Sequence, residues 1–122
     1  MTKQKKFKLG PKQRVWIKAL KSKKYKQGKL TLHRKKNDSY CCLGVANKVC
    51  KLGESENSDV LDDRFGDLGL VNNCGEIIGG FKFPRGNRHY SYLTAMNDSG
   101  VTFNKIAEFI ETNPELVFTK NV

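Results

Sequence analysis

The stretch LTAMNDSGVTFNKIAEFI, residues 93–110, decides the fold of the C-terminal third of this chain. Residues 93–98 suit a short helix, Ser99-Gly100 is a typical turn, and Thr102 is a favourable N-cap for a second helix. Four apolar side chains of that second helix recur at i, i+3, i+4 and i+7, namely Phe103, Ile106, Ala107 and Ile110. This spacing predicts a helical hairpin that ends at Asn113-Pro114.

Two more helices are predicted towards the N-terminus. Pro11 opens a helix that ends near Ser22, with Trp16 on its apolar side and Lys and Arg on the other. In residues 40–53 the apolar side chains keep helical spacing, and Gly53 is a natural C-terminal stop.

The remaining segments predict short strands. Leu30 and Leu32 alternate with polar residues, as in a half-buried strand. Residues 64–80 are rich in Gly and Asn, and their apolar pairs at 70–71 and 77–78 fit a small hairpin. We therefore expect an α+β fold, with about three helices, a small antiparallel sheet and a C-terminal helical hairpin.

Length and charge define the broad class. The chain has 122 residues, which favours one domain; we expect a basic mobile arm at 1–10 and a single α+β domain at 11–122. Residues 1–36 contain fifteen Lys or Arg and no Asp or Glu, whereas residues 37–122 contain eight and twelve. Such a field attracts polyanions, although a solubilising basic face without a specific ligand remains the alternative.

Motifs for chemistry are missing from the sequence. There is no C-x-x-C pair, no G-x-x-x-x-G-K-[ST] and no G-x-G-x-x-G, and the pair Asp62-Asp63 lies in a polar acidic loop. Cys41, Cys42, Cys50 and Cys74 fall mostly inside apolar patterns, so we expect reduced, mostly buried thiols. We expect a non-enzymatic protein with no metal and no cofactor.

The segment 81–92, FKFPRGNRHYSY, interleaves cations with rings. Arginine forks bind phosphate oxygens, so Arg85 and Arg88 are expected to meet phosphate, and His89 or Tyr90 to stack on a base. Lys26 and Lys29 are expected to close the site from the N-terminal side. The alternative is that Phe81 and Phe83 only anchor a solvated loop to the core. The expected ligand-binding residues are Lys26, Lys29, Arg85, Arg88, His89 and Tyr90.

The C-terminal helical hairpin has the spacing of a DNA reader but not the charge. The exposed side of its second helix carries Asn104, Lys105, Glu108 and Glu111. Carboxylates facing phosphates are repulsive, so we interpret this unit as structural.

Localisation follows from hydropathy. No stretch is apolar enough to span a bilayer, and the basic N-terminus is not followed by the apolar region of a signal peptide. We expect a cytoplasmic protein with no membrane partner.

Five motifs, in order and spacing, resemble a group of small, largely uncharacterised tailed-phage and prophage proteins over about residues 13–112. They are Trp16-Ile-Lys-Ala-Leu, Tyr25-Lys-Gln-Gly, Tyr40-Cys-Cys-Leu-Gly-Val, Leu93-x-x-Met-Asn-Asp and Phe103-x-x-Ile-Ala-x-x-Ile-Glu.

The resemblance implies a phage origin and hence host takeover or counter-defence. The leading hypothesis is a binding protein that sequesters a phosphate-bearing ligand such as a nucleotide immune signal. The alternatives are a DNA- or RNA-binding regulator that uses the basic arm and first helix, and an inhibitor that docks on an acidic surface of a host protein. The sequence leaves homo-oligomerisation open.

Overall fold

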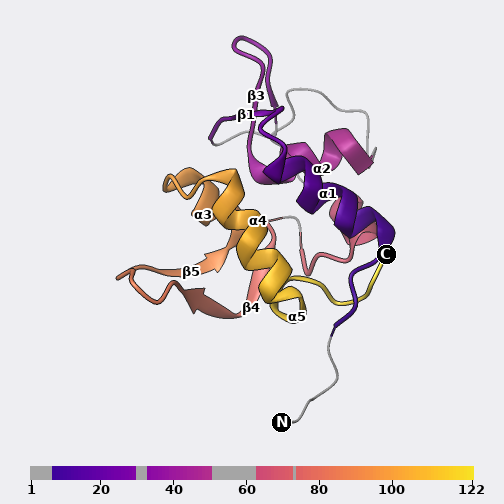
Figure 1. Cartoon of the computed structure of the whole chain (residues 1–122), viewed down its shortest axis with the longest axis vertical. Helices are drawn as coiled ribbons and strands as arrows, with labels where there is room; N and C mark the ends of the chain where they lie inside the picture. Colours follow the sequence, from indigo (N-terminus) through magenta and orange to yellow (C-terminus); the bar gives the residue numbers. More distant parts are fainter. Residues whose placement is uncertain (1–6, 30–32, 51–62, 73) are drawn as a thin grey trace.

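A computed structural model describes residues 7–29, 33–50, 63–72 and 74–122 of the chain (Figure 1). The helices are α1 (Pro11–Lys21), α2 (Cys42–Cys50), α3 (Leu93–Asp98), α4 (Phe103–Thr112) and α5 (Pro114–Val117), with a 3-10 helix η1 at Asp63–Leu68. The strands are β1 (Lys26–Gln27), β2 (His33–Arg34), β3 (Ser39–Tyr40), β4 (Glu76–Lys82) and β5 (His89–Tyr92). The predicted α+β class is confirmed.

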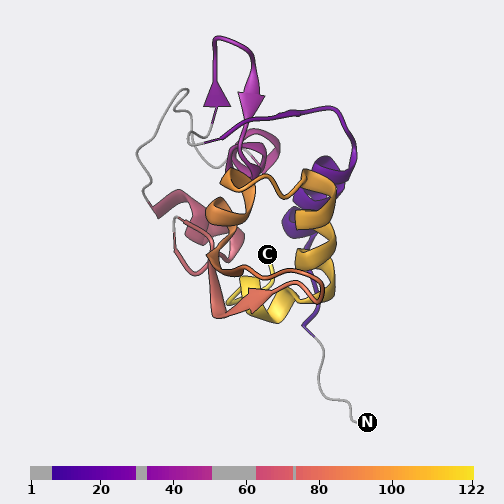
Figure 2. The same ribbon diagram turned by 90° about the vertical axis from the view of Figure 1, so that its left-hand side faces the viewer.

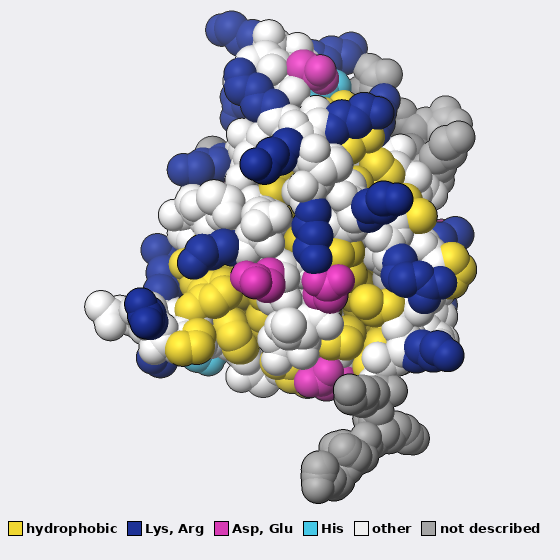
Figure 3. All heavy atoms as spheres, viewed as in Figure 1, with side chains coloured by type: hydrophobic (Ala, Val, Ile, Leu, Met, Phe, Trp, Pro, Cys, Tyr) yellow, Lys and Arg dark blue, Asp and Glu magenta, His cyan; other side chains and the backbone are white. Residues whose placement is uncertain are grey.

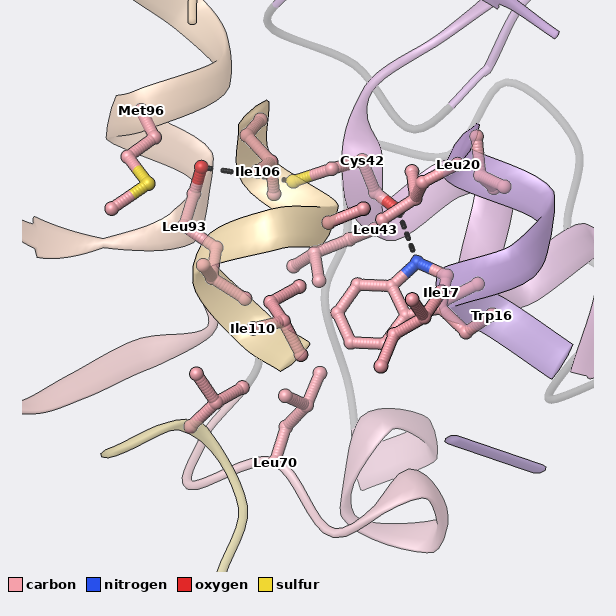
Figure 4. Packing of buried hydrophobic residues seen from close by; sticks show 14 of the residues in the cluster. Trp16, Ile17, Leu20, Cys42, Leu43, Leu70, Leu93, Met96, Ile106 and Ile110 are labelled. Atoms are coloured by element: carbon pink, nitrogen blue, oxygen red, sulfur yellow. Dashed lines mark hydrogen bonds between the residues drawn. The ribbon is translucent and has the colours of Figure 1, made fainter. Parts of the chain in front are cut away.

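The core lies where α1 packs against α2 and α4. Trp16 of α1 is fully buried, and its indole Nε1 donates a hydrogen bond to the carbonyl oxygen of Cys42 at 3.0 Å (Figure 4). The Cys42 thiol in turn donates to the carbonyl oxygen of Leu93, from α3. A buried indole needs such an acceptor, so this contact sets how α1 meets the start of α2.

The strands form two small sheets. In the first, β3 lies between β1 and β2, pairing parallel with β1 and antiparallel with β2. The second is the antiparallel pair β4–β5. Figure 2 shows the first sheet at one end of the long axis and the β4–β5 pair towards the other.

The hairpin predicted within residues 64–80 is wrong. Residues 63–68 form η1, and β4 pairs with β5, so the segment 81–92 contains the end of the first strand, the turn and the second strand of the hairpin. Gly79 and Gly80 have φ of +77° and +75°, which suits glycine and places them in a bulge between Glu76 and Phe81. The turn comes later, where the Gly86 amide donates to the carbonyl oxygen of Phe83.

The C-terminal helical hairpin is confirmed at the predicted residues. α3 spans Leu93–Asp98, and the hydroxyl of Thr102 accepts a hydrogen bond from the Lys105 amide as the N-cap of α4. The sequence did not indicate α5, because Asn113-Pro114 predicts only the end of the preceding helix. Proline also fits the first turn of a helix, and Pro114 begins one here.

Residues 7–10 of the predicted arm contact the core, and residues 1–6 lie outside the described residues. Phe7 stacks on Phe118 with ring centroids 6.0 Å apart. Gln13, which is fully buried, accepts from the Gly10 amide and donates to the carbonyl oxygens of Leu68 and Lys120. These bonds tie the start of α1 to the C-terminal segment.

Two predictions concern residues outside those described. The alternation of Leu30 and Leu32 and the helix stop at Gly53 both fall there; β2 begins directly after the first, and α2 ends at Cys50. Within the described part of the chain, no helix has the length and apolar character needed to cross a membrane.

Candidate functional site

Lysine and arginine side chains gather on α1 and the first sheet. We call this set the basic surface; all of its members are exposed: Lys12, Arg14, Lys18, Lys21, Lys23, Lys24, Lys26, Lys29, Arg34, Lys35 and Lys36. Figure 3 shows dark blue side chains over the first sheet and α1 and further ones along both lower edges of this face, while most of the magenta side chains lie in its lower half, over α4 and α5. The cations of α1 face outward because α1 buries its opposite side, including Trp16 and Leu20. This agrees with the amphipathic pattern of the sequence.

Aromatic rings lie within the basic surface. The His33 ring stacks on Tyr40 with centroids 4.4 Å apart, and Tyr25 meets Tyr40 edge-on at 5.4 Å. Lys24 lies 5.8 Å from the centroid of the Tyr25 ring, within the range of a cation–π contact. His33 also bonds the Asp38 carboxylate at 2.9 Å. Tyr25 and His33 are only partly buried, so this sheet offers rings next to cations.

Sequence reasoning missed these rings as a site. His33 and Tyr40 are seven residues apart in the chain, and only the pairing of β2 with β3 brings them together. The position of Tyr25 and His33 inside the acid-free run of residues 1–36 was a signal that the sequence did carry.

The β4–β5 hairpin holds four of the six expected ligand residues, but not all are available. Arg85, Arg88 and His89 are exposed, with the Arg88 guanidinium 5.7 Å from the centroid of the Tyr90 ring. Tyr90 is only 8% exposed, and its hydroxyl bonds the Ser99 hydroxyl at 2.9 Å. The expectation that the Tyr90 ring stacks on a base is therefore wrong for this structure.

Phe81 and Phe83 serve the core instead. The Phe81 ring lies 4.4 Å from that of Phe109 on α4, and Phe83 meets Phe81 edge-on at 5.1 Å. The two phenylalanines therefore anchor the hairpin to α4. The hairpin keeps its exposed charges and the exposed His89 ring, whose imidazole rests on Gly80, while Phe81 and Phe83 are half-buried.

Lys26 and Lys29 do not lie beside the β4–β5 hairpin, so they do not close a site at its turn. Lys26 is in β1, and Lys29 follows two residues after that strand. Figures 1 and 2 both place β1 towards the opposite end of the long axis from the turn between β4 and β5. The six predicted residues therefore belong to two separate surfaces.

Residues from four of the resemblance motifs meet inside the molecule. The Asn97 side chain, fully buried, accepts from the Cys42 amide at 3.1 Å and from Gln27 Nε2 at 3.0 Å, and donates to the Gly28 carbonyl oxygen at 2.7 Å. Gln27 Oε1 accepts from the Phe103 amide. These bonds join β1, α2, α3 and α4 at one point, so these motif residues support the fold and are not turned towards a ligand.

The cysteine thiols are poorly suited to nucleophilic chemistry. All four are free, and burial raises the pKa of the Cys41 thiol to about 11. Burial also raises the pKa of Cys42 well above its ordinary value. A thiol is nucleophilic only as thiolate, so both are unreactive at neutral pH. Among the described residues, no cluster of three or more His, Cys, Asp and Glu is arranged to hold a metal ion.

We predict slow alkylation of Cys41 and Cys42 in the folded protein. At about pH 8, iodoacetamide should modify them at least about 100-fold more slowly than in urea, because the unfolded thiols ionise near pH 8.5. Partly exposed Cys74 is the internal comparison and should react first. By linkage, the stability due to these thiols is full below about pH 8.5 and falls as pH rises towards their folded pKa. Mass spectrometry of timed samples measures the rates; equal rates in both states would contradict the burial argument.

Residues 10–66, less than half of the chain, match a family model described as "Domain of unknown function (DUF8296)". The matched segment contains the whole basic surface, together with its rings, and ends before the β4–β5 hairpin. No curated protein and no solved structure matched the chain.

Proposed function

We propose that this protein is a non-enzymatic binder of phosphate-bearing polyanions, a nucleic-acid strand in particular, and that the basic surface is its binding site. The observation that supports this most is the exposure of eleven cations over residues 12–36, a segment without a single Asp or Glu. Lysine and arginine side chains that neutralise phosphates release condensed counterions, and this is the main source of sequence-independent affinity for nucleic acids.

The rings of the first sheet favour a single strand over a duplex. Tyr25 and His33 lie among Lys24, Lys26 and Arg34, an arrangement that pairs base stacking with backbone neutralisation. The acidic side of α4, with Glu108 and Glu111 exposed, disfavours binding in which that helix enters a major groove.

The resemblance to phage proteins suggests the biological role in which such binding would act. A phage-encoded protein of the host cytoplasm that covers nucleic-acid strands would act in takeover or counter-defence. Capture of a small nucleotide signal at the tip of the β4–β5 hairpin is the second candidate. It is favoured by the exposed group Arg85, Arg88 and His89.

Salt dependence tests the proposal. Fluorescence anisotropy with a labelled single-stranded oligonucleotide should show affinity falling by about 100-fold or more between roughly 50 and 200 mM salt. The same titration with a small cyclic or linear nucleotide tests the second candidate. No binding to any oligonucleotide at the lowest salt would contradict the polyanion proposal. Capture of an acidic host protein under the same conditions would then favour the alternative of an inhibitor that docks on such a surface.

A further inference from the structure

An open pocket lies where α1 and the segment before it face α4. It has a volume of about 280 Å³ and is lined by Leu9, Arg14, Ile17, Lys18, Lys21 and Glu111. Leu9 and Ile17 supply apolar surface, and Ile17 is only 4% exposed. The charged residues supply three cations and one carboxylate. The pocket therefore joins an apolar floor to a positively charged rim.

The pocket is continuous with the basic surface. Arg14, Lys18 and Lys21 belong to both, since they lie on the exposed side of α1. Lys21 is paired with Glu111 of α4 at 2.5 Å, and Arg14 donates to the Leu9 carbonyl oxygen. Figure 3 shows dark blue and magenta side chains bordering yellow ones between these two helices. A strand lying along α1 would pass directly over this opening.

We infer that the pocket accepts one nucleotide unit, with its base on Leu9 and Ile17 and its phosphate on Arg14 and Lys18. This inference rests on the proposed function. The unit is either a nucleotide of a bound single strand or a free mononucleotide, since both present a flat, largely apolar base next to a phosphate.

Size and charge support this occupant over other anions. Ligand pockets commonly measure about 300–1,000 Å³, so a pocket of about 280 Å³ suits one base and sugar better than a larger ligand. A cationic rim with one carboxylate selects for negative charge. An aliphatic floor accepts any base by its flat face, so the pocket is expected to show little sequence preference.

The first experiment compares a single-stranded oligonucleotide with an abasic strand of equal phosphate number. The wild-type protein is expected to bind the base-containing strand about 10-fold more tightly, because both strands offer the same charge and only one offers bases. Leu9→Gln, which makes the pocket floor polar without changing charge or adding a ring, is expected to remove that preference. Val15→Gln is its matched control, since Val15 is on α1, 48% exposed, and does not line the pocket.

A second pair of variants avoids any risk to the fold. Glu111→Gln and Glu108→Gln each remove one carboxylate from the exposed side of α4, but only Glu111 lines the pocket. Glu111→Gln releases Lys21 and is expected to tighten binding of the base-containing strand about 5-fold, while Glu108→Gln changes it less than about 2-fold.

The outcomes separate this inference from the proposed function. Tight, salt-dependent binding with equal affinity for both strands, unaffected by Leu9→Gln, would leave the polyanion proposal standing and overturn the pocket. Equal effects of the two glutamate variants would also overturn it. A mononucleotide titrated alone identifies the source: saturable binding that Leu9→Gln removes assigns the pocket to free nucleotide. Binding of the strand alone assigns it to a polymer.

Discussion

Asn97→Ala is expected to lower the free energy of unfolding by about 3–5 kcal/mol, a large share of the roughly 5–15 kcal/mol of a typical domain. The substitution leaves the Cys42 amide and the Gly28 carbonyl without their partner and removes one from Gln27. A buried polar group that loses its partner costs about 1–3 kcal/mol. The lost side-chain volume in a fully buried position adds to this cost.

Urea unfolding followed by circular dichroism measures the change. Asn104→Ala is the matched control, because Asn104 is exposed on α4 and its loss is expected to cost less than about 0.5 kcal/mol. Gln27→Ala combined with Asn97→Ala should cost less than the sum of the single changes, since the two side chains share a hydrogen bond. An Asn97→Ala protein within about 1 kcal/mol of wild type would show that this junction does not hold the elements together.

The second large effect concerns binding. The triple variant Lys24→Gln, Lys26→Gln, Lys29→Gln is expected to weaken binding of a single-stranded oligonucleotide by about 100-fold at low salt and to reduce the salt slope by about three. All three side chains are exposed on the basic surface. Lys26 and Lys29 flank Gln27 and Gly28 of the Asn97 junction in the chain, but their side chains are exposed and make none of the junction's hydrogen bonds, so the folded structure should be unchanged.

A control of equal charge is available on the other surface. Lys82→Gln, Arg85→Gln, Arg88→Gln removes the same three charges from the β4–β5 hairpin, where all three residues are exposed. Its effect on oligonucleotide binding is expected to stay below about 5-fold, reflecting net charge alone. Anisotropy titrations at several salt concentrations measure the affinity and the salt slope of each triple variant. If the hairpin triple loses more affinity than the basic-surface triple, the ligand site is the hairpin and the assignment to the basic surface is wrong.

Local patterns predicted the helices well. Pro11, Thr102 and the apolar spacing from Phe103 indicate helix starts and faces that the structure reproduces. These signals depend on residues within one or two turns, which is the range over which helix capping and amphipathicity act. The strand pairing was harder, because it depends on partners distant in the chain. The sequence suggested that Ile77 pairs within residues 64–80, yet β4 pairs with β5.

The candidate site was predicted only in part. The unbalanced charge of residues 1–36 is a property of composition, and its exposure on α1 follows from the amphipathic pattern. The role of Tyr90 was wrong because side-chain burial depends on the whole fold. An alternation of rings and cations in a loop does not show which rings the core takes, and here α4 takes Phe81 and Phe83.

By itself, then, the sequence determined the α+β class, the helices that carry local capping and spacing signals, and a positive N-terminal third. The tertiary structure alone decided that Gln27, Cys42 and Asn97 meet in one buried junction. It also decided that Lys26 and Arg85 belong to separate surfaces, and that α1 and α4 enclose a pocket with a cationic rim. The physical reason is that local backbone preferences act over a few residues, whereas burial, long-range hydrogen bonds and cavities arise only when distant segments pack together.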